Sequence, residues 1–287
     1  MFEIYNESFT PIALPVDEAG YGLAGLDLSI SSVSQSLTEH TVTGMPGNII
    51  TGYQEGEREM SITARLKAKD AIDYRIKRDK AYAFFKRLGT FYVAEKYQPY
   101  KLMKVRVVES YQFARPENMQ KFATVEIPLK IIGQPYWISR FKSTGIDDQY
   151  LMDYWREGMG LDVSSSKLNY RYTTQSFTVY NAGTVPLKLI QEKDNFIITI
   201  KLNQATTKFR LTDYTGKYFE YNASGKTEWR LAAGSTVVLN GHSITANNTP
   251  IMDRTNRYFL QLQPGDNSMS TDLTNFTITF DFRFKYD

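Results

Sequence analysis

The sequence contains no cysteine. This absence excludes disulfide bonds, a thiolate nucleophile, an iron–sulfur cluster and a zinc site with cysteine ligands. Histidine is almost as rare, because only His40 and His242 occur and neither lies in an HExxH pattern or next to a second imidazole. A zinc hydrolase would therefore need a metal site made almost entirely of carboxylates. We expect no metal site and no bound cofactor.

Long apolar runs and concentrated positive charge are also missing. No stretch of about 18 apolar residues occurs, so the sequence predicts no membrane insertion. Residues 1–15 lack the basic start and the continuous apolar core of a secretory signal, and we expect no export by the general pathway. The 34 Lys and Arg nearly balance the 31 Asp and Glu, and they are interspersed. This pattern argues against a dedicated nucleic-acid binder.

Sequence motifs for catalysis are sparse as well. No G-x-S-x-G elbow is present, and residues 20–25 match G-x-G-x-x-G without opening a convincing helix in a βαβ unit. We interpret residues 20–25 as a loop. The carboxylate pairs Asp147-Asp148 and Glu57 with Glu59 fit a solvated surface better than a catalytic or calcium site. The sequence therefore predicts no catalytic residues and no enzyme.

Aromatic residues, in contrast, are abundant, with 20 Tyr, 17 Phe and 3 Trp among 287 residues. Such side chains pack well on pleated, half-buried surfaces, so they favour β structure. The length favours two domains, because a domain usually has about 100–200 residues. We predict a mainly β chain with a β-sandwich domain at residues 1–140, a connecting segment at 141–172 and a second β-sandwich domain at 173–287. Residues 150–155 within the connecting segment could form a short helix.

One strand and one helix are well defined in the first domain. Residues 58–66 alternate polar side chains with Met60, Ile62, Ala64 and Leu66, which predicts a core strand. Residues 70–88 predict an amphipathic helix, with Asp70 at its N-cap and Gly89 at its end. We expect the cationic residues of this helix, Lys77 among them, to lie largely on its solvated face. Its apolar stripe consists of Tyr74, Ala81, Tyr82, Phe85 and Leu88.

The segment from residue 26 to residue 56 predicts a hairpin with a long exposed loop. Short β segments at 26–33 and 41–42 precede a Gly- and Pro-containing turn at 44–48. The segment carries apolar residues but has too little nearby sequence to form a core of its own, so we predict that it contacts a neighbouring subunit. The alternative is that it completes its own sandwich. The candidate contacts are Leu28, Ile30, Val33, Met45, Ile49 and Ile50.

Beyond residue 175, short strand patterns recur without helices between them, which is typical of an antiparallel sandwich. Residues 276–286 alternate most cleanly, and they predict a well-buried strand. Trp229 or Tyr258 could stack against sugar rings, although packing in a core or an interface is the ordinary role of large aromatics. The remaining predicted strands span residues 177–180, 187–191, 196–202, 207–211, 218–221, 236–239 and 258–262.

The order of these features resembles a known family. The hairpin region comes first, followed by the strand at 58–66 and the helix at 70–88. Next come a strand at 122–132 with its closing Gly-Gln-Pro-Tyr-Trp at 133–137, and a sandwich with residues 258–267 before its last strand. This order resembles the distal tail protein (Dit) family of long-tailed siphophages, mostly those of Gram-positive hosts.

The resemblance implies a function in the virion. It implies that the first domain assembles six copies into a ring at the end of the tail tube, around the channel used by the tape measure protein and DNA. It implies a galectin-like second domain and an adaptor without catalytic activity. This adaptor would join the major tail protein of the tube to a Tal-type tail-tip protein and, in some phages, to receptor-binding proteins. The protein would be made in the host cytoplasm and end in the distal tail of the virion.

A carbohydrate-binding accessory module of a cell-wall-directed protein is the alternative hypothesis, and an enzyme is the third. Galectins bind sugar through an H-x-N-x-R strand, which residues 242–246 do not match. The sequence therefore does not predict a galectin-type sugar site.

Overall fold

The structure is a computed structural model that describes residues 1–15, 22–115, 122–147 and 167–287. The chain divides into two compact units, one of Met1–Trp137 with Asp287 and one of Ile138–Tyr286. Both are built mainly of antiparallel strands, which confirms the predicted mainly β fold class. Part of the glycine motif at 20–25, Asp148 and the possible helix at 150–155 lie outside the described residues.

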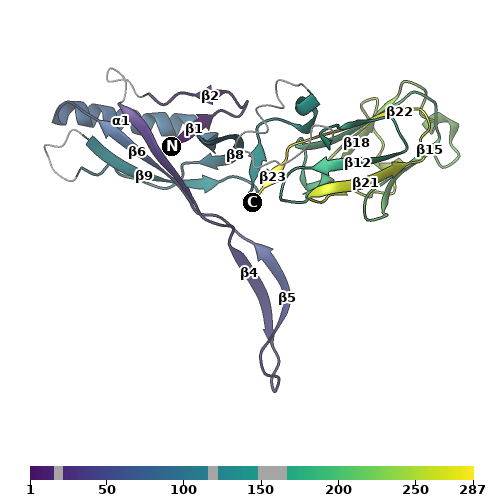
Figure 1. The fold of residues 1–287 in the computed structure, drawn as a ribbon, viewed down its shortest axis with the longest axis horizontal. Coiled ribbons are helices and arrows are strands. Elements are labelled where there is room, and N and C mark those ends of the chain that lie inside the picture. The colour runs from purple at the N-terminus through teal and green to yellow at the C-terminus, as the bar shows by residue number, and fades with distance from the viewer. Residues whose placement is uncertain (16–21, 116–121, 148–166) are drawn as a thin grey trace. The chain divides into compact units, whose positions relative to one another are not determined.

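A connected sheet forms the body of the first unit, with strand order β2-β1-β7-β8-β9-β6-β3 (Figure 1). The strands lie on one connected path, in which β8 and β9 share only the pairs Val105 with Ile131 and Arg106 with Lys130. The path curves around the core and brings β3 close to β1. A Cβ atom added to Gly25 of β3 would lie only 2.8 Å from the Phe2 ring of β1. The strands are β1 (Phe2–Tyr5), β2 (Pro11–Ile12), β3 (Leu23–Ile30), β6 (Met60–Lys67), β7 (Thr90–Glu95), β8 (Gln98–Arg106) and β9 (Phe122–Ile131).

Strands β6 and β9 pair along their whole length and present one buried and one exposed face. The predicted core residues of β6 are confirmed, since Ile62, Ala64 and Leu66 are fully buried and Met60 nearly so. Pro128 of β9 pairs with Ser61, and it lies beyond the short stretch where β9 pairs with β8. A proline is tolerated there because no neighbouring strand needs its missing donor.

The predicted amphipathic helix is α1 (Ala71–Leu88). The Asp70 side chain caps it by accepting hydrogen bonds from the backbone N–H groups of Ile72 and Asp73, both at 2.8 Å. Gly89 follows the last turn with φ 62°. Of the predicted stripe, Ala81 and Phe85 are buried, while Tyr74, Tyr82 and Leu88 are half-buried.

The prediction that Lys77 lies on the solvated face of the helix was wrong, because this side chain is buried. Its Nζ donates to the backbone oxygen of Lys67 at 3.2 Å and pairs with Asp73 at 3.1 Å. The long aliphatic stem can pack against the sheet while the ammonium reaches these oxygens. The pKa of Asp73 is held below its ordinary value by the backbone N–H of Lys69 first and also by Lys77.

A hairpin of β4 (Gln35–Thr41) and β5 (Asn48–Glu55) extends away from the sheet of the first unit (Figure 1). The two strands pair only with each other among the described residues. The expected hairpin arm at residues 26–33 is largely strand β3, which pairs with β6 in the main sheet. The projecting part is therefore shorter than predicted and more regular.

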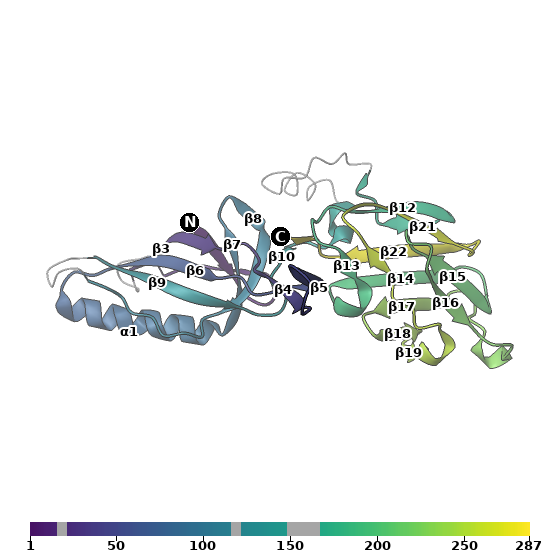
Figure 2. The same cartoon turned by 90° about the horizontal axis from the view of Figure 1, so that it is seen from below.

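The second unit is a sandwich of two antiparallel sheets, with strand orders β11-β22-β14-β17-β18-β19 and β12-β21-β15-β16 (Figure 2). The first sheet contains β11 (Arg171–Tyr172), β14 (Phe196–Leu202), β17 (Thr236–Asn240), β18 (Ser243–Ala246), β19 (Thr249–Pro250) and β22 (Phe276–Phe282). The second contains β12 (Ser176–Asn181), β15 (Lys208–Thr212), β16 (Tyr218–Asn222) and β21 (Gly265–Thr271).

Several short elements complete the second unit. A small separate pair joins β13 (Leu187–Lys188) with β20 (Gln261–Leu262). The predicted strand at 258–262 is therefore extended only at its end. Strand β10 (Trp137–Ser139), which begins at the last residue of the first unit before the boundary, pairs with β23 (Lys285–Tyr286). The 3-10 turns are η1 (Ser143–Asp147), η3 (Leu189–Gln191), η4 (Thr227–Trp229) and η5 (Met252–Arg254).

Strand β22 is the centre of the second core. It lies between β11 and β14, and the predicted alternation is confirmed from Phe276 to Phe284, whereas Lys285 and Tyr286 are both buried. The buried residues are Phe276, Ile278, Phe280, Phe282 and Phe284.

The expected connecting segment at 141–172 is part of the second unit at both of its described ends. Ser143 is fully buried, and its hydroxyl donates to the backbone oxygen of Phe280 at 2.8 Å. Tyr170 is also fully buried, and its backbone oxygen accepts from Phe280 N–H at 3.0 Å. Residues 141–147 and 167–172 therefore belong to a folded domain and are not a linker.

Candidate functional site

The β4–β5 hairpin carries apolar side chains that no core covers. Leu37 pairs directly with Tyr53, and their side chains are 52% and 72% exposed. A β-bulge between Thr38 and Glu39 leaves Thr51 without an opposite residue and pairs Glu39 with Ile50. Since paired positions alternate between faces, Ile50, at 60% exposed, lies on the same face as Leu37 and Tyr53. We name Leu37, Ile50 and Tyr53 the hairpin apolar face.

The six predicted contact residues do not form one surface. Leu28 is buried in β3, where it pairs with Ile62, so its own domain already covers it. Ile30 and Val33 are half-buried near the base of the hairpin. Met45, Ile49 and Ile50 are exposed at 55%, 42% and 60%. Ile49 pairs with His40 and faces away from the hairpin apolar face.

Sequence reasoning missed Leu37 and Tyr53, the most exposed pair of the hairpin. The prediction treated most of residues 34–56 as loop, whereas the structure has two strands there. The spacing of Ile50 and Tyr53 conceals the alternation, because the bulge breaks the period of two.

Polar contacts order the tip of the hairpin. Asn48 Nδ2 donates to Glu39 Oε2 at 2.6 Å, and Thr41 Oγ1 donates to Asn48 Oδ1 at 3.3 Å. Gly44 and Gly47 of the turn have φ 86° and 92°, a backbone region that suits glycine. The strands therefore hold their register up to the turn.

The base of the hairpin is fixed by backbone and hydroxyl contacts. Gly56 N–H donates to the backbone oxygen of Ser34 at 2.7 Å, and Ser34 Oγ donates to the backbone oxygen of Glu57 at 2.7 Å. The Tyr136 hydroxyl donates to the Glu55 carboxylate. Arg58 Nε donates to the backbone oxygen of Ser31 at 2.8 Å. These contacts hold a projecting ribbon on a folded domain.

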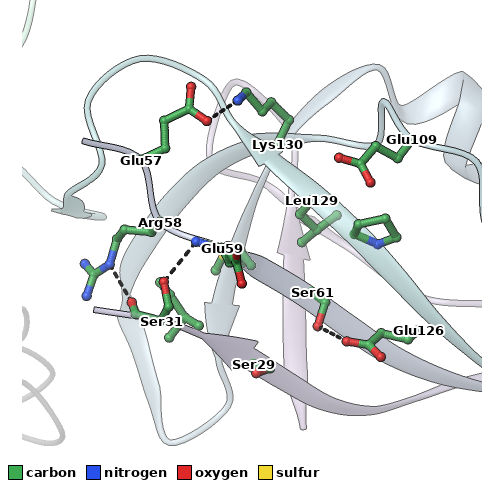
Figure 3. Close-up of a pocket in the computed structure, with 13 residues that line it drawn as sticks. Ser29, Ser31, Glu57, Arg58, Glu59, Ser61, Glu109, Glu126, Leu129 and Lys130 are labelled. Carbon is green, nitrogen blue, oxygen red and sulfur yellow. Dashed lines mark hydrogen bonds and ion pairs between the residues drawn. The ribbon is translucent and has the colours of Figure 1, made fainter. Parts of the chain in front are cut away.

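A polar groove lies beside this base on the exposed face of β6 and β9 (Figure 3). Its volume is about 480 Å³. Glu57 pairs with Lys130, and Ser61 Oγ donates to Glu126 Oε1 at 2.7 Å. Glu59 and Glu109 also line the groove and are exposed. We name this surface, lined by Glu59, Glu109 and Glu126, the acidic groove.

The two aromatic residues considered for sugar stacking are already engaged in the second unit. Lys226 Nζ and Arg254 Cζ lie 3.8 and 4.8 Å from the centre of the Trp229 ring. The Tyr258 hydroxyl donates to Asp213 Oδ2 at 2.5 Å. Burial, with Asp213 as a further cause, raises the pKa of Tyr258 to about 12. These contacts suit internal packing better than a sugar platform.

The described residues offer few other features typical of a metal site or a membrane segment. In the described part of the chain, no group of three or more His, Asp or Glu side chains could hold a metal ion. No helix among the described residues is long and apolar enough to cross a membrane.

Comparison with known proteins gives matches in both units. Residues 26–131 match the family described as phage tail protein RIFT-related domain, and residues 191–284 match the siphovirus-type tail component, C-terminal domain. The crystal structure of the phage SPP1 Dit protein, described as a paradigm of the hub adsorption apparatus in phages that infect Gram-positive bacteria, is similar. It shares 14% identity with a TM-score of 0.65, over 99% of both chains.

Two other solved structures resemble the chain more weakly. Both are baseplates of phage p2 in the activated conformation, one with Sr and one with Ca, at 7% and 8% identity and a TM-score of 0.42. Each covers 98% of this chain and 97% of the other. No curated protein matches the sequence.

The two family matches, in this order on one chain, define a structural protein of phage tails. The fold also resembles that of SPP1 Dit over the whole length, and the chain belongs to the distal tail protein family of siphophages. The sequence-based identification of this family is confirmed.

Proposed function

We propose that this protein forms a hexameric ring at the distal end of a phage tail and acts as a baseplate hub. The ring would join the tube of major tail protein to a Tal-type tail-tip protein, and it would carry receptor-binding proteins in phages that have them. Tape measure protein and DNA would pass through its channel without specific binding. Assembly would take place in the host cytoplasm, and the protein would have no enzymatic activity.

The observation that carries this proposal is the hairpin apolar face. An isolated two-stranded hairpin is marginal in water, and Leu37, Ile50 and Tyr53 gain nothing from being exposed. A ring needs a heterologous contact, in which one surface of a copy meets a different surface of the next. A projecting ribbon with an apolar face and open strand edges supplies one side of such a contact.

Mass photometry of the full-length protein tests the proposal. We expect a species of six chain masses for the wild type and a shift to monomers when Leu37, Ile50 and Tyr53 are all replaced by Ser. The control replaces Tyr97, Val108 and Ile190, which are also exposed but lie outside the hairpin, by Ser. A wild-type protein that stays monomeric at micromolar concentration, both alone and mixed with tail-tip protein, would contradict the ring.

A carbohydrate-binding module remains the alternative, and the structure offers no observation that favours it. Binding of cell-wall polysaccharide by a monomeric wild-type protein would support that alternative over a ring.

A further inference from the structure

Helix α1 has a second apolar stripe that faces solvent. Ile72 and Ile76 are 72% and 51% exposed, and they lie one turn apart on the face opposite the buried Ala81 and Phe85. Ala83 is exposed on the same stripe, two turns further along. The outward face of an amphipathic helix normally carries polar residues, so these two isoleucines have no role in the fold of their own unit.

Basic residues border this stripe on both sides. Arg75, Lys86 and Arg87 are exposed, and none of them forms an ion pair within the described ranges. Arg75 Nη1 donates only to the backbone oxygen of Ala71, at 2.9 Å. We name Ile72, Arg75, Ile76, Lys86 and Arg87 the outer helix face. Asp79, which pairs with Arg78, lies on the same strip between Ile76 and Ala83. The face is therefore apolar at Ile72 and Ile76 and has a mainly positive border.

The acidic groove has the opposite character. Glu59, Glu109 and Glu126 form no ion pair in the part of the chain that the structure describes. Pro128, on the same face of β9 as Glu126, is half-buried and gives the groove a small apolar floor. Figure 3 shows Glu59, Glu109 and Glu126 around the groove, with Glu126 beside Ser61. The charge and the apolar floor of the groove therefore complement the outer helix face.

The two surfaces lie on opposite sides of the same unit. The groove lies on the exposed face of β6 and β9, where Arg65, Thr124 and Glu126 alternate with buried residues. Helix α1 packs against β6 with its buried residues and therefore covers the other face. Figure 2 shows it along one side of these strands. One copy cannot place its own helix in its own groove, whereas the next copy can.

We propose that the outer helix face of one copy docks into the acidic groove of the next copy. This inference rests on the proposed ring and names a second contact in it, separate from the hairpin. The occupant is a second copy of this chain. A ring requires a heterologous, head-to-tail contact between two different surfaces of neighbouring copies, and these two complementary surfaces supply one.

A charge exchange in the full-length protein tests the contact. The helix variant is Arg75→Glu/Arg87→Glu, and the groove variant is Glu59→Lys/Glu126→Lys. In either variant alone every contact joins like charges, so we expect the midpoint concentration for assembly to rise at least about tenfold. In an equimolar mixture the two variants can alternate, because each helix then meets a groove of opposite charge. The mixture should assemble like the wild type.

Controls separate this contact from fold and from net charge. Lys188→Glu/Lys217→Glu makes the same charge change as the helix variant at exposed positions of the second unit, and it should assemble normally. Circular dichroism and thermal unfolding report whether each variant folds. Should a reversal unfold the chain, Arg75→Gln/Arg87→Gln replaces it. This milder variant should weaken assembly and reduce its sensitivity to salt.

The possible outcomes are distinct. A wild-type ring with folded single variants that assemble unchanged would overturn this inference and leave the ring standing. If both variants fail to assemble and mixing them does not restore assembly, the two surfaces are not partners, and this outcome also overturns the inference. A wild type that stays monomeric would overturn the ring and this contact together. Recovery only in the mixture supports the contact.

Discussion

The hairpin of β4 and β5 and the pair of β14 and β22 are both antiparallel ribbons, but their surroundings are opposite. Every residue of β4 is exposed, whereas every second residue of β22 is buried. Both ribbons carry large apolar side chains. In the second unit these side chains are buried in the core, whereas in the hairpin Leu37, Ile50 and Tyr53 stay mostly exposed among the described residues.

The difference shows that strand pairing and stability come from separate sources. The backbone ladder is complete in both ribbons, apart from the bulge in the hairpin. Burial supplies most of the net stability of a sheet, because hydrogen bonds largely exchange water for protein partners. The hairpin must therefore depend on its base and, in the assembly, on a neighbour.

The largest expected effect is in the buried ribbon. Phe280→Ala removes a fully buried ring that packs near Tyr172, Phe177 and Phe196. The free energy of unfolding of the second unit should fall by about 3–5 kcal/mol. Tyr53→Ala in the hairpin should change the free energy of unfolding by less than about 0.5 kcal/mol. Denaturant unfolding of the two variants, compared side by side, checks this contrast.

A buried ion pair gives the next largest effect. Lys285 and Glu192 are 4% and 3% exposed and pair with each other. Glu192→Gln leaves the ammonium buried without its counter-ion, so we expect a loss of about 3–5 kcal/mol. Glu39→Gln at the exposed tip of the hairpin should cost less than about 1 kcal/mol.

The pH dependence of the Glu192→Gln variant follows from the lysine. Burial lowers the pKa of Lys285, and Glu192 partly opposes this shift. At pH values between the folded-state pKa of Lys285 and the ordinary pKa of lysine, the unfolded chain binds more protons than the folded chain. Stability of the variant should therefore rise with pH in that window. An unfolding free energy that falls as pH increases there would contradict this assignment.

A smaller effect is expected at the base of the hairpin. A Cβ on Gly56 would lie 2.5 Å from Ser34 Oγ, so Gly56→Ala should displace this hydroxyl from the backbone oxygen of Glu57. The cost should be about 1 kcal/mol, with faster amide exchange confined to β4 and β5. Gly52→Ala is the matched control, because a Cβ there meets nothing within 4 Å.

The smallest effect on folding belongs to the hairpin apolar face. The variant with Leu37, Ile50 and Tyr53 replaced by Ser should unfold within about 0.5 kcal/mol of the wild type. Calorimetry at a concentration where both proteins are monomeric isolates folding from assembly. A large loss of monomer stability would show that these side chains pack within their own chain.

Sequence patterns predicted the parts of the fold in which one face is buried. The alternation in residues 58–66 and 276–286 marks a core because burial selects apolar residues at every second position. The helix followed from its stripe and its Asp70 cap. The strands that were missed, β18 and β21 among them, carry Ser, Thr, Asn or Ala at many positions, so their pattern is weak.

The candidate site was harder to predict than the core. The projecting segment was recognised from apolar residues without a local core, but Leu28 was assigned to it although β3 buries this side chain. The pairing of β3 with β6 joins residues that are distant in sequence, and no local pattern contains that information. Lys77 was misplaced for a related reason, because its oxygen partner belongs to Lys67 at the end of another strand.

The bulge in the hairpin has a consequence for how such a surface could change between related phages. Thr51 is the additional residue of this bulge. Deleting this one codon would restore a regular ladder in which Glu39 still lies opposite Ile50, so Asn48 to Ile50 would keep their faces. The bulge therefore adds one residue to the hairpin without moving Ile50 from the face of Tyr53. A surface of this kind can gain or lose a residue at the bulge and still present the same side chains to a partner.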